Sequence, residues 1–161
     1  MPKALTTAML VFAATLVVAA TAFAEGEPTR SEYVTAVDPI CKKNIDSNKK
    51  ILKPVRKEVK NDKLKPAAKA FEKVSKNFGR TIKSIEAVPR PAEDSPRLEK
   101  WFKFLKIVQT NLGKVGKALR QGNKVKATHE QIRAERSSNA ANNVSFVFGF
   151  SYCALKPSQF Q

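Results

Sequence analysis

The sequence predicts an all-α fold, an antiparallel bundle of about four helices whose first helix is kinked or split. Four segments carry apolar residues at spacings of three and four, which is the period of an amphipathic helix. No segment alternates apolar and polar residues as a half-buried strand does. Short polar connections separate the four segments, and this favours antiparallel packing of neighbouring helices around one core.

The first segment begins near Ser31 and contains two prolines. Asp38 precedes Pro39, an order that suits a helix restart with Asp38 as the N-cap. Pro54 lies inside an otherwise helical run, where a proline removes a backbone hydrogen bond. We therefore expect a bent helix or two helical pieces. The apolar positions of this segment are Val34, Val37, Ile40, Cys41, Ile45, Leu52, Val55 and Val59.

The second segment is predicted to be helical from about residue 66 to residue 87. Pro66 suits the first helical turn, where its missing N–H is not needed. Pro89 and Pro91 end the helix and start an extended loop, because a residue before proline avoids the helical conformation. Its apolar stripe consists of Leu64, Phe71, Val74, Phe78, Ile82 and Ile85.

The third segment has a single apolar stripe over about six turns. Ser95 is the predicted N-cap, Pro96 takes the first helical position and Gly122 ends the helix. The stripe consists of Leu98, Trp101, Phe102, Leu105, Val108, Leu112, Val115 and Leu119.

The fourth segment starts after Gly122 and Asn123 and runs into the uncharged sequence VSFVFGFSYC, residues 144–153. This sequence is shorter than the ~20 apolar residues of a membrane span, and an edge strand would have no partner in a helical chain. We interpret it as the last helical turns followed by a cover for the end of the bundle. The apolar positions of the segment are Val125, Ile132, Ala140, Ala141 and Val144, and we expect Val144, Val147 and Phe148 to pack inward, Gly149 to stop the helix and Phe150 to cover the bundle end.

Residues 1–24 have the pattern of a secretory signal peptide. Lys3 precedes an apolar run over residues 8–20, and Ala22-Phe23-Ala24 matches the A-x-A cleavage pattern. We predict cleavage after Ala24 and a secreted or extracytoplasmic protein with no transmembrane segment in the mature chain; an uncleaved anchor is the alternative. The predicted parts of the mature chain are a flexible N-terminus at 25–30, a single helical-bundle domain at 31–155 and a tail at 156–161.

Cys41 and Cys153 are the only two cysteines, and they lie near opposite ends of the mature chain. An exported chain with an even number of cysteines usually forms disulfides, and two cysteines allow one pairing. We predict a disulfide between the first helix and the C-terminal end, and two unpaired buried thiols are the alternative.

Motifs for catalysis, metal binding and haem attachment are missing from the sequence, including G-x-S-x-G, the P-loop, H-E-x-x-H and C-x-x-C. The single histidine, His129, lies among polar residues and is predicted to face solvent. We therefore predict no enzyme, no metal and no cofactor. A buried carboxylate pair in a cleft would indicate an enzyme instead.

Positive charge is the strongest remaining signal. The formal charge is +16, and loss of Lys3 with the signal peptide lowers it to +15. Residues 41–83 contain 15 Lys or Arg against four acids. Two stripes result, one of Lys42, Lys49, Lys53, Arg56 and Lys60, and one of Lys65, Lys69, Lys73, Lys76, Arg80 and Lys83. If the two helices are adjacent, the stripes merge into one positive face.

Such a face attracts polyanions, here an anionic cell-envelope polymer, nucleic acid or an acidic protein, in a salt-dependent way. Lysines outnumber arginines 22 to 8, which favours point-charge attraction over bidentate recognition. The aromatic residues lie on apolar stripes, so they indicate a core rather than base stacking. The alternative is a structural or protein-interaction bundle whose charge serves only solubility.

Four short motifs complete the sequence evidence: Asp38-Pro39-Ile40-Cys41, the Pro-rich loop 88–91, the early Trp101 and Gly149-Phe150-Ser151-Tyr152-Cys153. With the signal peptide, this pattern resembles small exported helical proteins of unassigned function from high-GC Gram-positive bacteria. The resemblance implies the bundle and the disulfide, and it implies no catalytic or ligand-binding residue. Pro54 and the lysine enrichment depart from the pattern and leave any shared partner open.

Overall fold

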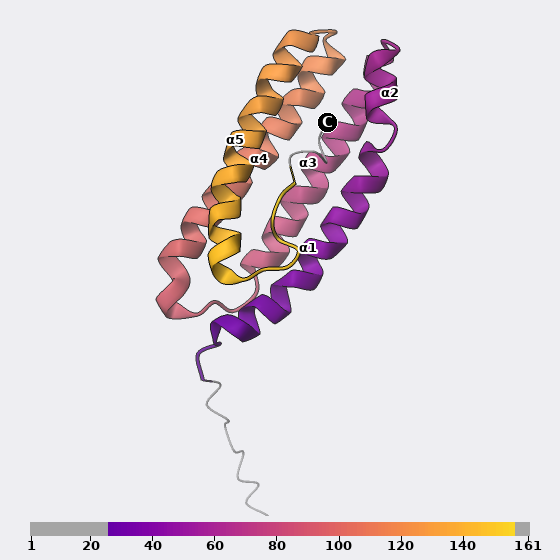
Figure 1. Ribbon diagram of the computed structural model, residues 1–161. Coiled ribbons are helices and arrows are strands. Elements are labelled where there is room, and N and C mark those ends of the chain that lie inside the picture. Colours follow the sequence, from indigo (N-terminus) through magenta and orange to yellow (C-terminus); the bar gives the residue numbers. More distant parts are fainter. Residues whose placement is uncertain (1–25, 157–161) are drawn as a thin grey trace, which may run out of the picture.

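The computed structural model describes residues 26–156, which form four long helices (Figure 1). The helices are α1 (Arg30–Leu52), α3 (Leu64–Glu86), α4 (Ser95–Arg120) and α5 (Lys124–Phe148), with the short helix α2 (Val55–Lys60) after α1 and the 3-10 helix η1 (Ala92–Asp94) before α4. No strand occurs in this part of the chain, so the predicted all-α class is confirmed. The predicted signal peptide and residues 157–161 of the predicted tail lie outside the described residues.

Successive long helices run antiparallel, as predicted (Figure 1). Helix α3 packs against α1 and α4, and α4 packs against α5. Helices α1 and α5 make little direct contact with each other. The segment after α5 turns back along the bundle between them, so it closes the side that the helices leave open (Figure 1).

The break in the first helical segment lies at Lys53 and Pro54, between α1 and α2. Helix α1 passes through Pro39 without interruption, so the helix restart with Asp38 as N-cap is wrong. Pro39 costs α1 the hydrogen bond to the Thr35 carbonyl. The helix continues because the residues around Pro39 pack into the core, with Val37 fully buried.

Thr29 is the N-cap of α1. Its side chain accepts a hydrogen bond from the Glu32 backbone N–H at 3.3 Å, and the Glu32 carboxylate accepts one from the Thr29 backbone N–H at 2.8 Å. This capping box satisfies two backbone donors, and the hydrogen bond from Thr29 lowers the pKa of Glu32. Helix α1 therefore has a defined start, with Thr29 as its cap.

The predicted apolar stripes of α3 and α4 are buried in the core, except that Leu64 is only partly buried. Helix α3 begins at Leu64, with Pro66 in its first turn. The predicted N-cap Ser95 is instead the first residue of α4, because the η1 turn leads directly into that helix. Gly122 and Gly149 follow α4 and α5 as predicted, with left-handed φ angles of +74° and +75° that favour glycine.

Helix α5 faces the core largely with small residues, whereas several of its larger apolar residues lie outside, which differs from the prediction. Val125 is 71% exposed, Ile132 is 43% exposed and Val147 is 52% exposed, so the inward packing of Val147 is wrong. The buried positions include Ala127, Ala134, Ser138 and Ala141, which allow α5 to lie close to α4. Near the end of the helix Val144 and Phe148 are buried, as predicted.

Phe150 covers the end of the bundle, as predicted (8% exposed). Its ring stacks on Trp101 with 5.2 Å between centroids and on Phe148 with 5.4 Å. The Tyr33 ring from α1 lies 6.2 Å away, and burial raises the pKa of Tyr33 to about 12. This aromatic cluster joins α1, α4, α5 and the C-terminal segment around one side chain.

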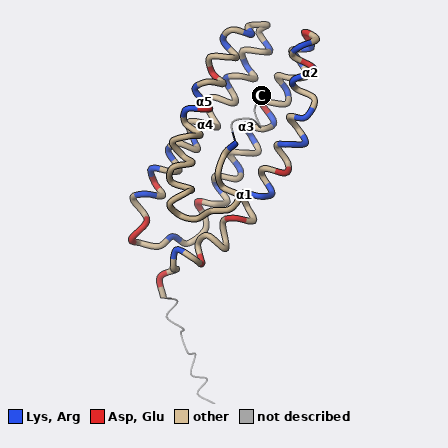
Figure 2. The backbone as a smooth tube through the Cα atoms, viewed as in Figure 1, with Lys and Arg blue, Asp and Glu red and all other residues tan. Residues whose placement is uncertain are grey.

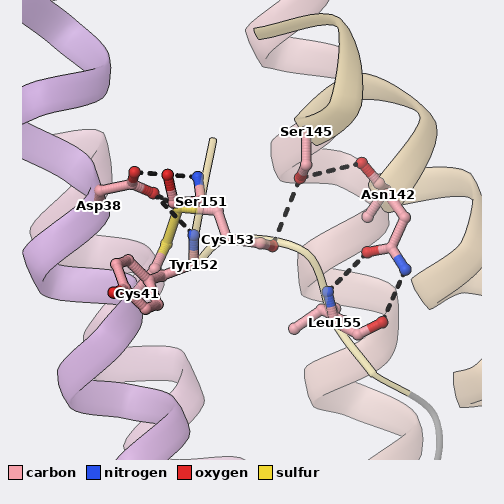
Figure 3. The surroundings of a disulfide bond; sticks show 9 residues. Asp38, Cys41, Asn142, Ser145, Ser151, Tyr152, Cys153 and Leu155 are labelled. Atoms are coloured by element: carbon pink, nitrogen blue, oxygen red, sulfur yellow. Dashed lines mark hydrogen bonds between the residues drawn. A yellow bond between two sulfur atoms is a disulfide. The ribbon is translucent and has the colours of Figure 1, made fainter. Parts of the chain in front are cut away.

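A disulfide and several hydrogen bonds hold the C-terminal segment on both sides (Figure 3). On the α1 side, Cys41 and Cys153 form the predicted disulfide, with 5.0 Å between their Cα atoms. The Asp38 carboxylate accepts hydrogen bonds from the backbone N–H groups of Ser151 at 2.9 Å and Tyr152 at 3.0 Å. On the α5 side, the Asn142 amide accepts from the Leu155 N–H and donates to the Leu155 carbonyl, each at 2.6 Å.

Gly116→Ala tests the close approach of α3 and α4. A Cβ atom at Gly116 would lie 3.0 Å from the Ala68 carbonyl oxygen and 2.9 Å from Glu72 Cγ. We expect this variant to lower the free energy of unfolding by about 1–2 kcal/mol in urea, although alanine favours helices. Gly113→Ala is the matched control, because it meets only the Ser75 side chain at 3.2 Å, and we expect a smaller change. Equal stability of both variants would contradict tight packing at Gly116.

Cys153→Ser tests the contribution of the disulfide. The bond joins residues 112 apart, so its loss should lower the free energy of unfolding by roughly 4 kcal/mol in the chain-entropy model. Urea unfolding under non-reducing conditions measures this change. Cys41→Ser should have the same effect, and the double variant should lose no more than either single one. An unchanged urea midpoint for Cys153→Ser would show that the bond contributes nothing.

Asp38→Asn tests the bonds that hold the C-terminal turn. The change removes the charge that both backbone N–H groups approach, and we expect a loss of about 1–2 kcal/mol. Hydrogen exchange at the Ser151 and Tyr152 amides should become faster. Asp46→Asn on the same helix is the control, since among the described residues Asp46 forms an ion pair with Lys42 alone, and this pair is exposed. Unaltered exchange at both amides would refute this role of Asp38.

Candidate functional site

All eleven cations of the two predicted stripes are exposed. Residues 42 and 49 lie on α1, residue 53 lies at the break, residues 56 and 60 lie on α2, and the remaining six lie on α3. Helix α3 packs against both α1 and α2. Lys and Arg follow one another along all three helices, with few acidic positions between them (Figure 2). The structure therefore brings the two stripes onto neighbouring helices.

Carboxylates neutralise very little of this charge. Among the described residues, Lys42 is the one stripe cation with an ion pair, at 2.7 Å from Asp46. That hydrogen bond raises the pKa of Lys42 and lowers the pKa of Asp46. Glu72, which lies between the α3 lysines in sequence, pairs instead with Arg120 of α4 and raises its pKa. The α3 stripe is therefore left with uncompensated positive charge.

Lys42, the first cation of the stripe that begins on α1, does not face α3. Lys42 lies on the flank of α1 next to the C-terminal segment, with its Nζ 5.8 Å from the centre of the Tyr152 ring. The flank of α1 next to α3 carries Ser47, whose Oγ accepts a hydrogen bond from Asn77 of α3 at 3.3 Å. The predicted merger of the stripes therefore needs cations on the flank next to α3.

Lys43 and Lys50 supply those cations, and neither was among the predicted residues. Both are exposed, and their spacing of seven residues places them on one face of α1. Lys43 lines the groove between α1 and α3. In the sequence Lys43 directly follows Lys42 and lies outside the chosen stripe. Lys43 is recognised as part of the positive face only when the side of α1 that packs against α3 is known, and this depends on the tertiary structure.

The groove between α1 and α3 has a volume of about 330 Å³. It is lined by Ile40, Lys43, Asn44, Ser47, Asn77, Arg80, Thr81 and Ser84. Two of these residues are cations, most of the others are polar, and none of these lining residues is an acid. Of the stripe residues only Arg80 lines this groove, so sequence reasoning missed the rest of it.

The described residues contain no cluster of three or more His, Cys, Asp or Glu side chains that could hold a metal ion. His129 is exposed on α5, as predicted. The two acids that are buried within residues 26–156 each bond to arginine: Asp94 accepts from Arg30 Nε and Nη2 at 2.7 Å, and Glu130 pairs with Arg133 at 3.2 Å. The hydrogen bond to Asp94 raises the pKa of Arg30.

In the part of the chain that the structure covers, no helix is both long enough and apolar enough to cross a bilayer. Comparisons with protein-family models, with curated proteins and with solved structures find no match to this chain.

Proposed function

We propose that this chain is an exported, non-catalytic binding protein that takes up an anionic polymer at the cell envelope through its basic face. We define the basic face as the eleven stripe cations together with Lys43 and Lys50. One observation carries the proposal. Within residues 26–156 the cations of this face are exposed, and all but Lys42 lack a carboxylate partner.

The geometry of α3 suits a long ligand. The helix has 23 residues and is therefore about 35 Å long. Its cations recur every three or four residues, which spaces them about 5–6 Å apart along the axis. Clustered like charges repel one another, and a polyanion relieves this repulsion while it releases its counterions. Flexible lysines accept such a ligand without a fixed register.

The site of action rests on two further observations. The disulfide agrees with an oxidising compartment outside the cytoplasm, where such bonds persist. The signal peptide at residues 1–24 remains a prediction from sequence, as does the resemblance to exported proteins of Gram-positive bacteria. Together they support the cell envelope as the location, and anionic envelope polymers are abundant ligands of the required charge.

A second candidate is a protein-interaction bundle whose positive charge serves only solubility. The exposed apolar side chains of α5 favour it. Val125, Ile132 and Phe146 are 71%, 43% and 88% exposed. They are separated in sequence by multiples of seven residues, which places them on one face of the helix. A helix with this pattern is typical of one that packs against another helix.

Substitution of Lys69, Lys73 and Lys76 by Gln tests the proposed function. Polyphosphate and polygalacturonate are the phosphate and carboxylate probes, and fluorescence anisotropy measures affinity across a salt series. We expect the log–log slope of affinity against salt to fall by about 2 units, because three counterion-releasing contacts are lost. Circular dichroism confirms that the variant is folded.

The matched control replaces Lys100, Lys114 and Lys117 of α4 by Gln. These lysines are exposed, and the three substitutions remove the same total charge. We expect this control to change the slope by less than half as much. Equal effects of the two variants would contradict a localised basic face. Absence of binding to either probe at low salt would contradict the proposed function and favour the interaction bundle.

A further inference from the structure

The polar groove between α1 and α3 combines charge with directed hydrogen-bond donors. Lys43 stands on its α1 side and Arg80 on its α3 side. Among the described residues neither cation has a carboxylate partner. The lysine stripes attract any polyanion, whereas a groove with fixed donors is able to select one chemical group.

Asn77 holds Arg80 in place. The Asn77 amide oxygen accepts a hydrogen bond from Arg80 Nη2, and the Asn77 NH2 group donates to Ser47 Oγ at 3.3 Å. These two hydrogen bonds cross the groove from α3 to α1, and they use one N–H of the Arg80 guanidinium group. The remaining N–H groups of Arg80 keep the planar fork that matches a phosphate group.

Two α1 side chains add neutral donors. Ser47 Oγ accepts from Asn77, and its own O–H donates to no group in the described part of the chain, so it is available to a ligand. Asn44 is 7% exposed, and its amide oxygen accepts from Asn48 Nδ2 at 3.1 Å. That bond leaves the Asn44 NH2 group as a donor at the groove. Arg80, Lys43, Ser47 and Asn44 therefore offer donors from both helices.

The neighbouring groove between α3 and α4 is less suited to an anion. It is also reached by Arg80, together with Lys76 and Lys83. However, Glu86 lies in that groove and pairs with Lys106 at 2.6 Å. The Glu86 carboxylate repels an anionic group, and it already neutralises Lys106. The α1–α3 groove has no acid among its described lining residues.

We infer that the α1–α3 groove is the seat for a single phosphate group of the polymer, with Arg80 and Lys43 as its charged ligands and Ser47 and Asn44 as its neutral ones. This inference rests on the proposed function and names the ligand chemistry of the same face. The bound phosphate group fixes the position of the polymer on the protein. The lysines of α3 then contact the repeat units of the polymer that follow this group.

Titration with inorganic phosphate, followed by NMR of the isotopically labelled protein, tests the seat itself. We expect saturable shifts at the Asn44 and Asn77 side-chain amides, at the Ser47 backbone and at Arg80 Nε. Sodium chloride at the same ionic strength should not reproduce them. Acetate, as the carboxylate arm, should bind more weakly than phosphate. Shifts that spread evenly over α3, or that do not saturate, would show that the groove is not a phosphate site.

Matched variants then test the seat in the polymer complex. Arg80→Gln should lower the affinity for polyphosphate about tenfold, since hydrogen bonds to a charged group are lost. Lys83→Gln removes the same charge one turn away, outside this groove, and should cost only about twofold. Ser47→Ala changes no charge and should weaken polyphosphate binding more than polygalacturonate binding. Arg80→Lys should restore less than half of the lost free energy of binding, because lysine lacks the fork.

The outcomes separate the two proposals. If Arg80→Gln and Lys83→Gln weaken binding equally and Ser47→Ala has no effect, the groove is not a seat, while binding by the basic face still stands. If inorganic phosphate saturates the groove but polyphosphate does not bind, the seat is correct and the proposed polymer function is wrong. Circular dichroism of each variant confirms the fold.

Discussion

The attachment of the C-terminal segment to α1 is the constraint on which the rest of the bundle depends. Helices α1 and α5 scarcely touch, so the bundle would be open along one side without this segment. The Cys41–Cys153 bond and the Asp38 carboxylate hold it to α1, and Phe150 fills the end of the core. The short C-terminal segment thereby shields the aromatic core of the bundle from solvent.

This closure explains how the protein tolerates so much positive charge. Like charges on one surface favour the unfolded chain, because unfolding moves them apart. The disulfide opposes this effect by restricting the unfolded chain, and the apolar stripes of α3 and α4 oppose it by burial. Since the core and the disulfide lie on the inner side of the helices, the outer faces of α1, α2 and α3 are left free to carry cations. The buried residues that stabilise the fold and the exposed cations of the proposed basic face thus lie on different faces of the same helices.

The interface between α1 and α3 is the exception to this division. Asn44 is buried at the α1–α3 groove, where it accepts a hydrogen bond from the buried Asn48, and a Ser47–Asn77 hydrogen bond spans the two helices. Polar groups at such a position cost free energy unless they are bonded. Asn44 and Asn48 bond to each other, and the proposed phosphate group would accept a hydrogen bond from the Asn44 NH2 group that remains. This interface is also where the charge of α1 meets that of α3.

The sequence by itself determined the helices, most of their ends and the exposure of the stripe cations. These features depend on local spacing, on residues such as Gly122 and Gly149, and on charge, all of which act within a few residues of the chain. Only the tertiary structure decided the continuity of α1 through Pro39, the bonding of Asp38 to the C-terminal turn and the outward position of Val147. Each depends on which neighbour covers which side of a helix, a contact between residues distant in sequence. The α1–α3 groove belongs to the same class, because its donors face one another only when the two helices pack.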